Sequence, residues 1–250
     1  MRCRFVARDF KRAQYRTDLF AAASSVSTSR IVPMKAVKCK LRTFTFDSSN
    51  AFFHVPVTEP SCADPPAEWT AAWIEKGGDP ATIWELRREL YGRRKEPQAW
   101  TEWKAQQLLD RGFLRCAEAP WIYQHSERDI AVDVHMDDGH GCASVEDAEW
   151  FRDSLQETFM LKEFIIHYPG ARYTHLKRQY EVQEDHILLK VNEKHTDSIV
   201  TMLGIEQDRF VGTPMADYPV EEIVDSSALD PARGSLDRSA VGTALYVAPR

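Results

Sequence analysis

The chain has 250 residues, of which 43% are hydrophobic, and a net charge of −6. A chain of this size can bury a substantial core and form one large domain or two small ones. No apolar run approaches the roughly 20 residues of a membrane span, and the N-terminus lacks the apolar stretch of a signal peptide. We therefore expect an intracellular protein, cytoplasmic or nuclear, that has no membrane partner.

Positive charge is concentrated at the start of the chain. Residues 1–42 hold eleven Lys and Arg against two Asp, a net charge of +9, so the remaining 208 residues carry −15. A basic arm before an acidic body is typical of proteins that meet phosphates. Basic N-terminal segments are also often simply solvated, so the charge pattern indicates a nucleic-acid or nucleotide role and leaves that alternative open.

The first half of the chain predicts helices and strands in mixed order. The expected elements are a helix over 20–39 that Pro33 splits or kinks, a strand from Thr43, a proline-rich loop over 58–80, and a helix over 98–111. This mixture predicts the α+β class.

The second half continues the same mixture. We expect strands at 121–124 and 130–136, a helix over 145–161, strands at 179–182 and 187–191, and a helix over 193–203 that Gly204 stops. Ser144 and Asp147 form a capping-box-like start for the helix over 145–161. From residue 216 onward the sequence turns polar and Pro-punctuated, and little core is expected there.

An adjacent pair of acids, Asp137 and Asp138, follows the strand-like run 130–136, about ninety residues after a lone Asp47. Like charges side by side disfavour a strand interior, so the pair predicts a hairpin turn. Such a turn can hold carboxylates beside a third from a neighbouring strand, and clustered carboxylate oxygens suit Mg²⁺. A solvated turn without chemistry is the alternative, because isolated Asp-Asp pairs are usually that.

Four ordered segments resemble the reverse transcriptase of copia-type retrotransposons. They are residues 4–10 (RFVARDF), 47–54 (DSSNAFFH), 90–100 (LYGRRKEPQAW) and 135–138 (HMDD). Residues 213–215 and 241–246 are also similar to the segments that join that polymerase to its ribonuclease H domain. Four motifs in the same order are more specific than any one of them.

The resemblance implies a polymerase right-hand fold. Its palm would be an antiparallel sheet packed on helices, accompanied by fingers and a reduced thumb, with the ribonuclease H domain absent. Residues 1–182 would form fingers and palm, 183–215 a thumb-like segment, and 216–250 a linker towards the missing ribonuclease H domain.

The implied activity is RNA-directed DNA polymerisation, in which deoxynucleotides are added to a primer by two-metal phosphoryl transfer. Asp47, Asp137 and Asp138 would be the catalytic and metal-binding residues and would hold two Mg²⁺ ions, with Mn²⁺ as the alternative. The implied partners are an RNA or DNA template with its primer, deoxynucleoside triphosphates, and other domains of a Pol polyprotein.

Further residues would bind substrates. Phe52 matches an aromatic residue that excludes a ribose 2′-hydroxyl, and Gln98 a glutamine that contacts the incoming nucleotide. Arg4 and Arg8, with Arg2 as a substitute, resemble a fingers strand that grips triphosphate. A second basic cluster would contact template phosphates: Arg87, Arg88, Arg93, Arg94 and Lys95. The alternatives are a core position for Phe52 or Phe53, and a solvated surface for Gln98 and the cluster.

Three positions depart from the family pattern. His135 replaces a residue that is usually Tyr, two glycines in Gly139-His140-Gly141 are expected to weaken a strand, and Leu176-Lys177-Arg178 lacks a glycine at the turn that grips the primer. A decayed or truncated element, inert but still able to bind nucleic acid, is therefore the first alternative. The second is a Zn²⁺- or Mn²⁺-dependent hydrolase that uses His135, Asp137, Asp138 and His140.

Overall fold

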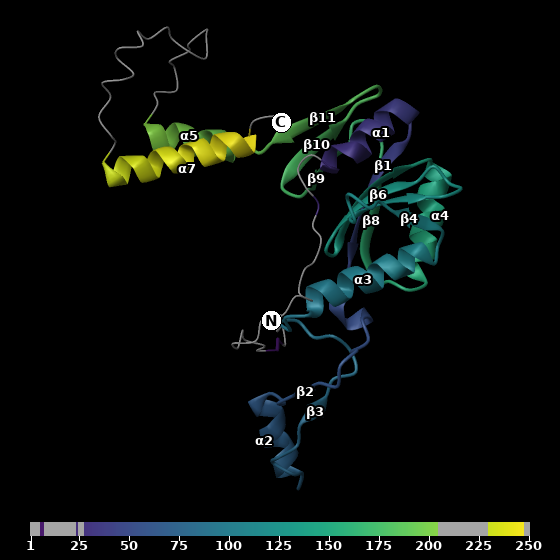
Figure 1. The fold of residues 1–250 in the computed structure, drawn as a ribbon, viewed down its shortest axis with the longest axis vertical. Helices are drawn as coiled ribbons and strands as arrows, with labels where there is room; N and C mark the ends of the chain where they lie inside the picture. The colour runs from purple at the N-terminus through teal and green to yellow at the C-terminus, as the bar shows by residue number, and fades with distance from the viewer. Residues whose placement is uncertain (1–5, 8–23, 25–27, 205–229, 248–250) are drawn as a thin grey trace. The chain divides into compact units, whose positions relative to one another are not determined.

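The computed structural model describes residues 6–7, 24, 28–204 and 230–247 (Figure 1). Contacts divide the chain into two compact units, one comprising Met1–Pro169 with Glu184–His186 and the other Gly170–Gln183 with Ile187–Arg250. The fold is mixed α/β, with antiparallel sheets and packed helices. No helix within the described ranges is both long and apolar enough to cross a membrane.

A six-stranded antiparallel sheet forms the centre of the first unit, in the order β4-β5-β6-β7-β1-β8. The strands are β1 (Arg42–Ser48), β4 (Phe113–Arg115), β5 (Ile122–His125), β6 (Ala131–His135), β7 (Asp138–Ala143) and β8 (Leu161–His167). The early strand β1 lies between β7 and β8, so residues far apart in the sequence become neighbours. This order brings the strand that ends in Asp47 and Ser48 beside the strand that begins with Asp138.

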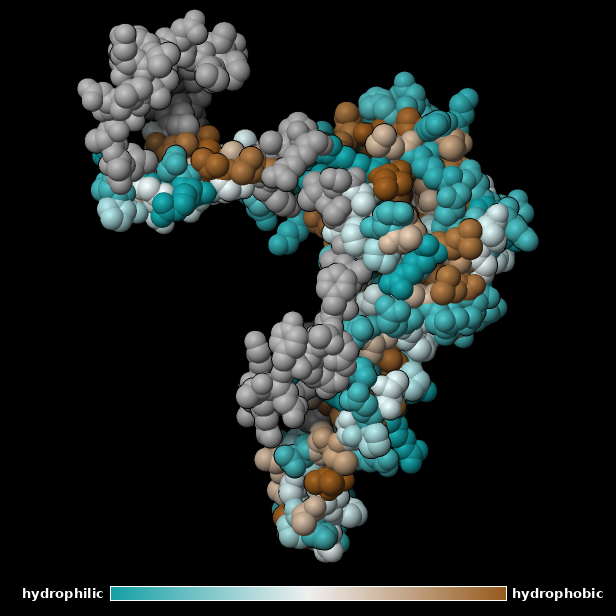
Figure 2. Space-filling view, viewed as in Figure 1, coloured by the Kyte–Doolittle hydropathy of each residue, from teal (hydrophilic) through white to brown (hydrophobic). Residues whose placement is uncertain are grey.

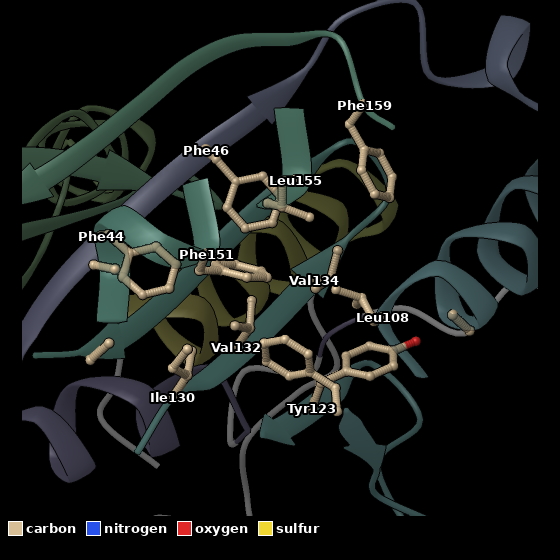
Figure 3. Packing of buried hydrophobic residues seen from close by; sticks show 14 of the residues in the cluster. Phe44, Phe46, Leu108, Tyr123, Ile130, Val132, Val134, Phe151, Leu155 and Phe159 are labelled. Atoms are coloured by element: carbon tan, nitrogen blue, oxygen red, sulfur yellow. The ribbon is translucent and has the colours of Figure 1, made fainter. Parts of the chain in front are cut away.

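The main hydrophobic core lies between one face of this sheet and two helices, α3 (Glu96–Leu109) and α4 (Val145–Gln156) (Figure 3). Phe44 and Phe46 alternate along β1 onto this face, and both rings contact Phe151 of α4, with centroid separations of 5.7 and 5.9 Å. Burial of each such side chain stabilises the fold by about 1.5–3 kcal/mol. Helix α1 (Ile31–Cys39) also contacts β1, β6 and β7.

The glycines of β7 make room for this core, and the strand forms in spite of them. A Cβ atom added at Gly139 would lie 2.1 Å from the Phe46 ring, and one added at Gly141 would lie 2.2 Å from the Phe44 ring. β7 is paired on both sides, with β6 and with β1. The rings of Phe44 and Phe46 therefore occupy the space that side chains at Gly141 and Gly139 would need.

Helix ends follow local signals, with two corrections. The Ser144 hydroxyl accepts a hydrogen bond from the Asp147 amide at 3.0 Å, so the predicted cap of α4 is confirmed. The helix ends at Gln156, five residues earlier than the predicted boundary at 161, and Phe159 joins the core from beyond it. Pro33 does not kink a helix, because it lies in the first turn of α1, where amides have no helical partner.

The predicted loop over 58–80 contains regular structure. Helix α2 (Ala67–Glu75) lies in it, and the short strands β2 (Cys62–Ala63) and β3 (Trp84–Glu85) pair beside it. Trp69 and Trp73, one helical turn apart, stack with centroids 5.4 Å apart. The prolines of this segment predicted a loop, and this local contact was overlooked. No residue of α2 is buried, and apolar side chains lie at the surface of this segment (Figure 2).

The second unit contains a three-stranded antiparallel sheet and two helices. Its elements are β9 (Arg172–His175), β10 (Arg178–Val182), β11 (Ile187–Val191), α5 (Lys194–Leu203) and α7 (Pro231–Val247), with the strands in the order β11-β10-β9. Gly204 ends α5 with φ 61°, as predicted. Little core was expected near the end of the chain, and Ala240 is the one buried residue among the described side chains of α7. This helix begins where the Asp230 carboxylate caps the amides of Ala232 and Arg233. The fingers, palm, thumb and linker assignments stay predictions.

Candidate functional site

Two of the three predicted catalytic carboxylates face each other across adjacent strands. Asp47 on β1 is the register partner of Asp138 on β7. Side chains alternate along both strands, so these two lie on the sheet face opposite the phenylalanine core. Directly opposed residues have Cβ atoms about 5 Å apart. The predicted proximity of Asp47 to the acidic pair is therefore present in the fold.

The third carboxylate belongs to the predicted hairpin turn. His135 and Asp138 are the last pair of the β6–β7 ladder, which leaves Met136 and Asp137 as a two-residue turn. Met136 has φ 54°, a conformation that costs a non-glycine residue about 1–2 kcal/mol. The Ser48 amide of β1 donates to the Asp137 carbonyl at 3.0 Å. Both aspartates of the turn are exposed.

Helix α3 supports this turn through two residues that sequence reasoning missed. The Trp100 indole N–H donates to the Met136 carbonyl at 2.8 Å, and the Lys104 Nζ donates to the same oxygen at 2.7 Å. Lys104 is 5% exposed, and burial lowers its pKa to about 7 although Asp137 and Asp133 act to raise it. The sequence contained no signal for this role, because Lys104 stands among ordinary residues of a predicted helix.

Like charges crowd the acidic residues. Desolvation raises the pKa of Asp138, and the neighbouring carboxylates of Asp137 and Asp47 raise it further. Lys162 of β8 forms an ion pair with Asp47, and this hydrogen bond raises the pKa of the lysine. A protein cation thus already partly neutralises the cluster.

The acidic residues match Mg²⁺ in chemistry more closely than in arrangement. Carboxylate oxygens are the usual protein ligands of this ion, and the strand register sets two of them opposite each other. Within the described ranges, however, no three His, Cys, Asp or Glu side chains are gathered so that they could hold a metal ion. The donor types fit a divalent cation, and Lys162 would compete with such an ion for Asp47.

A buried polar layer lies beside the acidic residues on the same sheet face. Asp133 of β6 is fully buried opposite His140 of β7, and its carboxylate accepts a hydrogen bond from the Ser24 hydroxyl at 2.7 Å. Burial raises the pKa of Asp133 to about 6 and lowers the pKa of His167, on β8, to about 4. In both groups burial disfavours the charged form relative to water.

The four residues of the hydrolase alternative do not form a metal-holding group. His140 is fully buried, whereas Asp137 and Asp138 are exposed. His135 pairs with Asp138 in the strand register, and its Nδ1 accepts a hydrogen bond from the Ser24 amide at 3.3 Å. The structure thus gives this alternative no support.

The predicted nucleotide contacts lie near the same hairpin and α3. Phe52, in the 3₁₀ helix η2 (Ala51–His54), is half-buried and makes edge-to-face contacts with Tyr91 at 4.8 Å and Trp100 at 6.4 Å. Phe53 is 43% exposed, so Phe52 is the member of the pair that packs on the core. Gln98 is half-buried in the first turn of α3, and its side chain has no hydrogen-bond partner in the described part of the chain.

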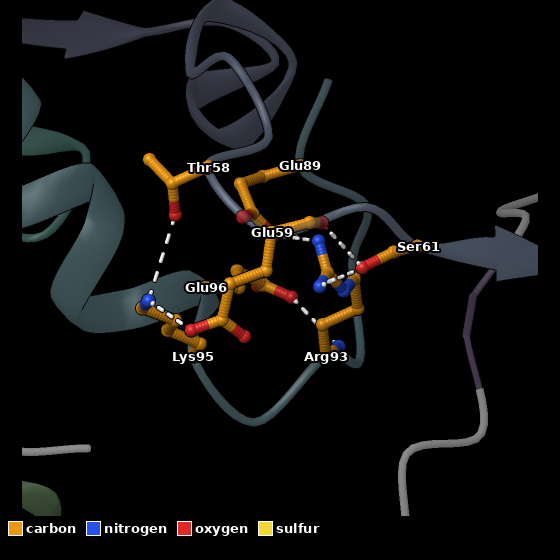
Figure 4. Close-up of polar contacts among 7 residues, drawn as sticks. All are labelled: Thr58, Glu59, Ser61, Glu89, Arg93, Lys95 and Glu96. Atoms are coloured by element: carbon orange, nitrogen blue, oxygen red, sulfur yellow. Dashed lines mark hydrogen bonds and ion pairs between the residues drawn. The ribbon is translucent and has the colours of Figure 1, made fainter. Parts of the chain in front are cut away.

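The basic cluster is divided between internal and surface roles (Figure 4). Arg93 donates to the buried Glu89 at 2.7 Å and to the Ser61 hydroxyl at 2.7 Å, so its guanidinium holds the protein together. Lys95 is paired with Glu59 at 2.9 Å. Arg88 donates to the His54 carbonyl at 2.8 Å. Arg87 and Arg88 are exposed, whereas Arg94 is half-buried and makes a contact of its own.

The predicted triphosphate contacts Arg2, Arg4 and Arg8 lie outside the described residues. Between the last two, the Ala7 amide donates to the Tyr91 carbonyl at 2.6 Å. Gly92 has φ 90°, and a Cβ atom there would lie 2.2 Å from the Ala7 carbonyl oxygen. The absence of a side chain at Gly92 thus allows the first segment to lie beside the 90–100 motif.

Comparisons with known proteins identify no family. No protein-family model matches the sequence, and no curated protein matches it. Among solved structures, telomerase from Candida albicans, in complex with the TWJ fragment of telomeric RNA, is similar over 90% of this chain, with 9% identity and a TM-score of 0.41. The similarity covers 43% of that telomerase chain, less than half of its length. A likeness at this level carries no argument about activity.

Proposed function

We propose that this chain is the fingers and palm of a copia-type reverse transcriptase, an RNA-directed DNA polymerase that extends a primer with deoxynucleotides. One observation carries the proposal: strands far apart in the sequence place Asp47 opposite Asp138, with Asp137 in the adjoining turn. That arrangement joins two of the four motifs that resemble the family. The proposed partners are an RNA or DNA template with its primer, deoxynucleoside triphosphates and further Pol domains.

In this proposal, Asp47, Asp137 and Asp138 hold two Mg²⁺ ions, with Mn²⁺ as the alternative. Bound Mg²⁺ supplies Lewis-acid activation of the primer 3′-hydroxyl and neutralises charge on the leaving pyrophosphate. Lys162 contacts one oxygen of Asp47 and would compete with a metal ion for that carboxylate. Phe52, backed by Tyr91 and Trp100, is placed to resist displacement by a ribose 2′-hydroxyl.

Nucleic-acid binding is assigned to the surface members of the basic cluster. Arg87 and Arg88, the two exposed members, are the proposed phosphate contacts. Arg93 is excluded from that role, because its guanidinium is 12% exposed and paired with a glutamate that is 1% exposed. Phosphate contacts of this kind give affinity without sequence specificity, and they weaken as salt concentration rises.

The experiment is primer extension on an RNA template with Mg²⁺, comparing the native chain with Asp137→Asn and Asp153→Asn. Asp153 is an exposed acid of α4 beside Arg152, so its substitution is a matched control for charge. We expect extension by the native chain and by Asp153→Asn, and at least a hundredfold loss in Asp137→Asn, since removal of an electrostatic contact to the transition state has effects of about that size. Equal incorporation by Asp137→Asn and the native chain would reject the proposed role of Asp137.

An inert, nucleic-acid-binding remnant is the second candidate function. The Lys162–Asp47 pair favours it, because a lysine that neutralises Asp47 makes the strand pairing stable without a divalent ion. The two candidates differ in one assay series. Retained, salt-sensitive RNA binding without primer extension in either Mg²⁺ or Mn²⁺ would support the remnant and reject the polymerase.

A further inference from the structure

Helix α3 holds the acidic turn at a single atom, the carbonyl oxygen of Met136. Trp100 and Lys104 lie one turn apart on α3, so their side chains share a face of the helix. Both donate to the Met136 carbonyl, and the Lys104 Nζ also lies 5.6 Å from the centre of the Trp100 ring. A carbonyl oxygen has two lone pairs, so these donors use its full accepting capacity.

We propose that Lys104 is a positioning residue which, together with Trp100, fixes the Met136–Asp137 peptide and thereby the direction of the Asp137 carboxylate. Its importance for catalysis rests on the proposed function, whereas its effect on the turn does not. Lys104 itself is buried beneath the turn and is not a catalytic residue, because the turn backbone lies between its amine and any substrate on the acidic face.

The backbone of the turn explains why an anchor is needed. Met136 has φ 54°, and a two-residue hairpin loop with a positive φ at its first central position has a defined orientation of the peptide that follows. A methionine does not favour this conformation, unlike glycine. The two donors from α3 hold the Met136 carbonyl, and the Ser48 amide holds the Asp137 carbonyl from the other side. The Cα atom of Asp137 lies between the two peptides whose carbonyls are held, so the direction of its side chain is fixed from both sides.

The side chain at position 104 has no packing reason to be a lysine. It is 5% exposed on a helix that contributes Trp100, Ala105 and Leu108 to the hydrophobic core. Burial of an amine is unfavourable unless a polar partner receives it, and the Met136 carbonyl is that partner. The charged groups that act on Lys104 are Asp137 and Asp133 on the hairpin and Arg115 on β4. The amine can donate to the carbonyl in either protonation state.

The sequence offers a direct spectroscopic test of the turn. Met136 is the only methionine that is followed by an aspartate, so a sample with ¹³C-carbonyl Met and ¹⁵N-Asp gives a single carbonyl-to-amide cross-peak, from this peptide. We expect Lys104→Met to shift that peak, because the carbonyl loses one donor. Leu108→Met, a buried substitution one turn further along α3 without a polar contact to the turn, should leave it in place. Neither substitution creates a second Met-Asp pair.

Enzyme kinetics supply the second measurement. We expect Lys104→Met to lower kcat for primer extension about tenfold, the effect of one lost hydrogen bond to a charged donor, while the KM for deoxynucleotide stays within about twofold. Leu108→Met should extend primers at the native rate. The melting temperature of Lys104→Met should equal or exceed that of the native chain, because the variant no longer buries an amine.

Trp100→Phe keeps the inference testable if Lys104→Met does not fold. It removes the other donor and leaves Lys104 in place, so its peak should lie between the peak of the native chain and that of the urea-unfolded chain. An unshifted peak in Lys104→Met, or a peak that depends on Trp100 alone, would overturn the role of Lys104, as would native kcat in Lys104→Met. If the native chain extends no primer, the proposed function fails, while the cross-peak still decides whether Lys104 fixes the turn.

Discussion

Two hairpins of this chain contain two-residue turns with non-glycine residues at positive φ. In the β6–β7 hairpin, Met136 has φ 54°, and in the β9–β10 hairpin, Leu176 and Lys177 have φ 47° and 64°. The first turn receives three hydrogen bonds from outside its own strands, to the carbonyls of Met136 and Asp137. Within the described part of the chain, no residue donates to the carbonyls of the second turn.

This difference shows that a two-residue turn with a positive φ can be maintained in two ways. Residues in sparsely populated backbone regions persist where the surroundings over-determine them, and such places concentrate at functional sites. The β6–β7 turn meets that description, because α3 and β1 both hold it. The β9–β10 turn is defined by strand pairing alone, between His175 and Arg178. We therefore expect substitutions around the two hairpins to have different consequences.

The largest expected effect comes from the strand that leaves the acidic turn. Gly139→Ala would place a Cβ atom 2.1 Å from the Phe46 ring, so we expect it to lower the free energy of unfolding by about 3 kcal/mol. Urea denaturation followed by circular dichroism measures the change. The matched control is Gln179→Ala, the exposed residue at the same distance from the turn of the β9–β10 hairpin, for which we expect a change within about 0.5 kcal/mol. Equal effects would remove the structural distinction between the hairpins.

The next effect is the pH dependence of stability that Asp133 gives to the β6–β7 hairpin. The folded pKa of Asp133 is raised to about 6 from 3.8, so the folded state binds its proton more tightly and loses stability as pH rises between these values. Asp133→Asn removes this dependence. The difference in free energy of unfolding, variant minus native, should therefore be about 2 kcal/mol larger at pH 7 than at pH 4. Urea denaturation at both pH values measures that gain.

His167 also makes stability depend on pH, so the free energies of unfolding of the native chain and Asp133→Asn must be compared at each pH. Its folded pKa is lowered to about 4 from 6.5, so its contribution to stability rises with pH over an overlapping range. Because both proteins contain His167, its contribution cancels in the difference. A difference that does not change with pH would contradict the buried, proton-binding state of Asp133.

The smallest effect concerns the unsupported turn. Lys177→Gly places a residue without a Cβ atom at φ 64°, and we expect the free energy of unfolding to increase by about 1 kcal/mol. Gln179→Gly, made two positions later on the regular strand β10, should instead lower it by about 1 kcal/mol. Differential scanning calorimetry gives the sign of each change. A stabilising Gln179→Gly or a destabilising Lys177→Gly would show that the turn is not strained.

The sequence predicted those parts of the fold that depend on local chemistry. Adjacent carboxylates in Asp137-Asp138 indicated the hairpin turn, and Ser144 with Asp147 indicated the start of α4. The neighbourhood of Asp47 and Asp138 was expected from the resemblance of their motifs, and the strand register agrees with it. The catalytic role of these residues stays a prediction.

The parts that sequence reasoning missed depend on contacts between distant segments. Gly139 and Gly141 resembled defects because the rings that fill their space belong to a strand almost a hundred residues earlier. Lys104 resembled an ordinary helix residue, since nothing in its neighbourhood indicates that its amine meets the Met136 carbonyl. Arg93 resembled its neighbours Arg94 and Lys95, although Glu89 and Ser61 hold it inside the protein.

The aromatic residues are distributed unequally between the two units. All seven tryptophans, including the stacked pair Trp69 and Trp73, lie between residues 69 and 150, in the first unit. The second unit has no tryptophan, and its stacked aromatic pair is Tyr173 and Tyr180, with centroids 4.9 Å apart. Indole emission therefore reports the unfolding of the first unit alone. One sample, excited at an indole wavelength and observed in parallel by far-ultraviolet dichroism, would show whether the two units melt together or in sequence.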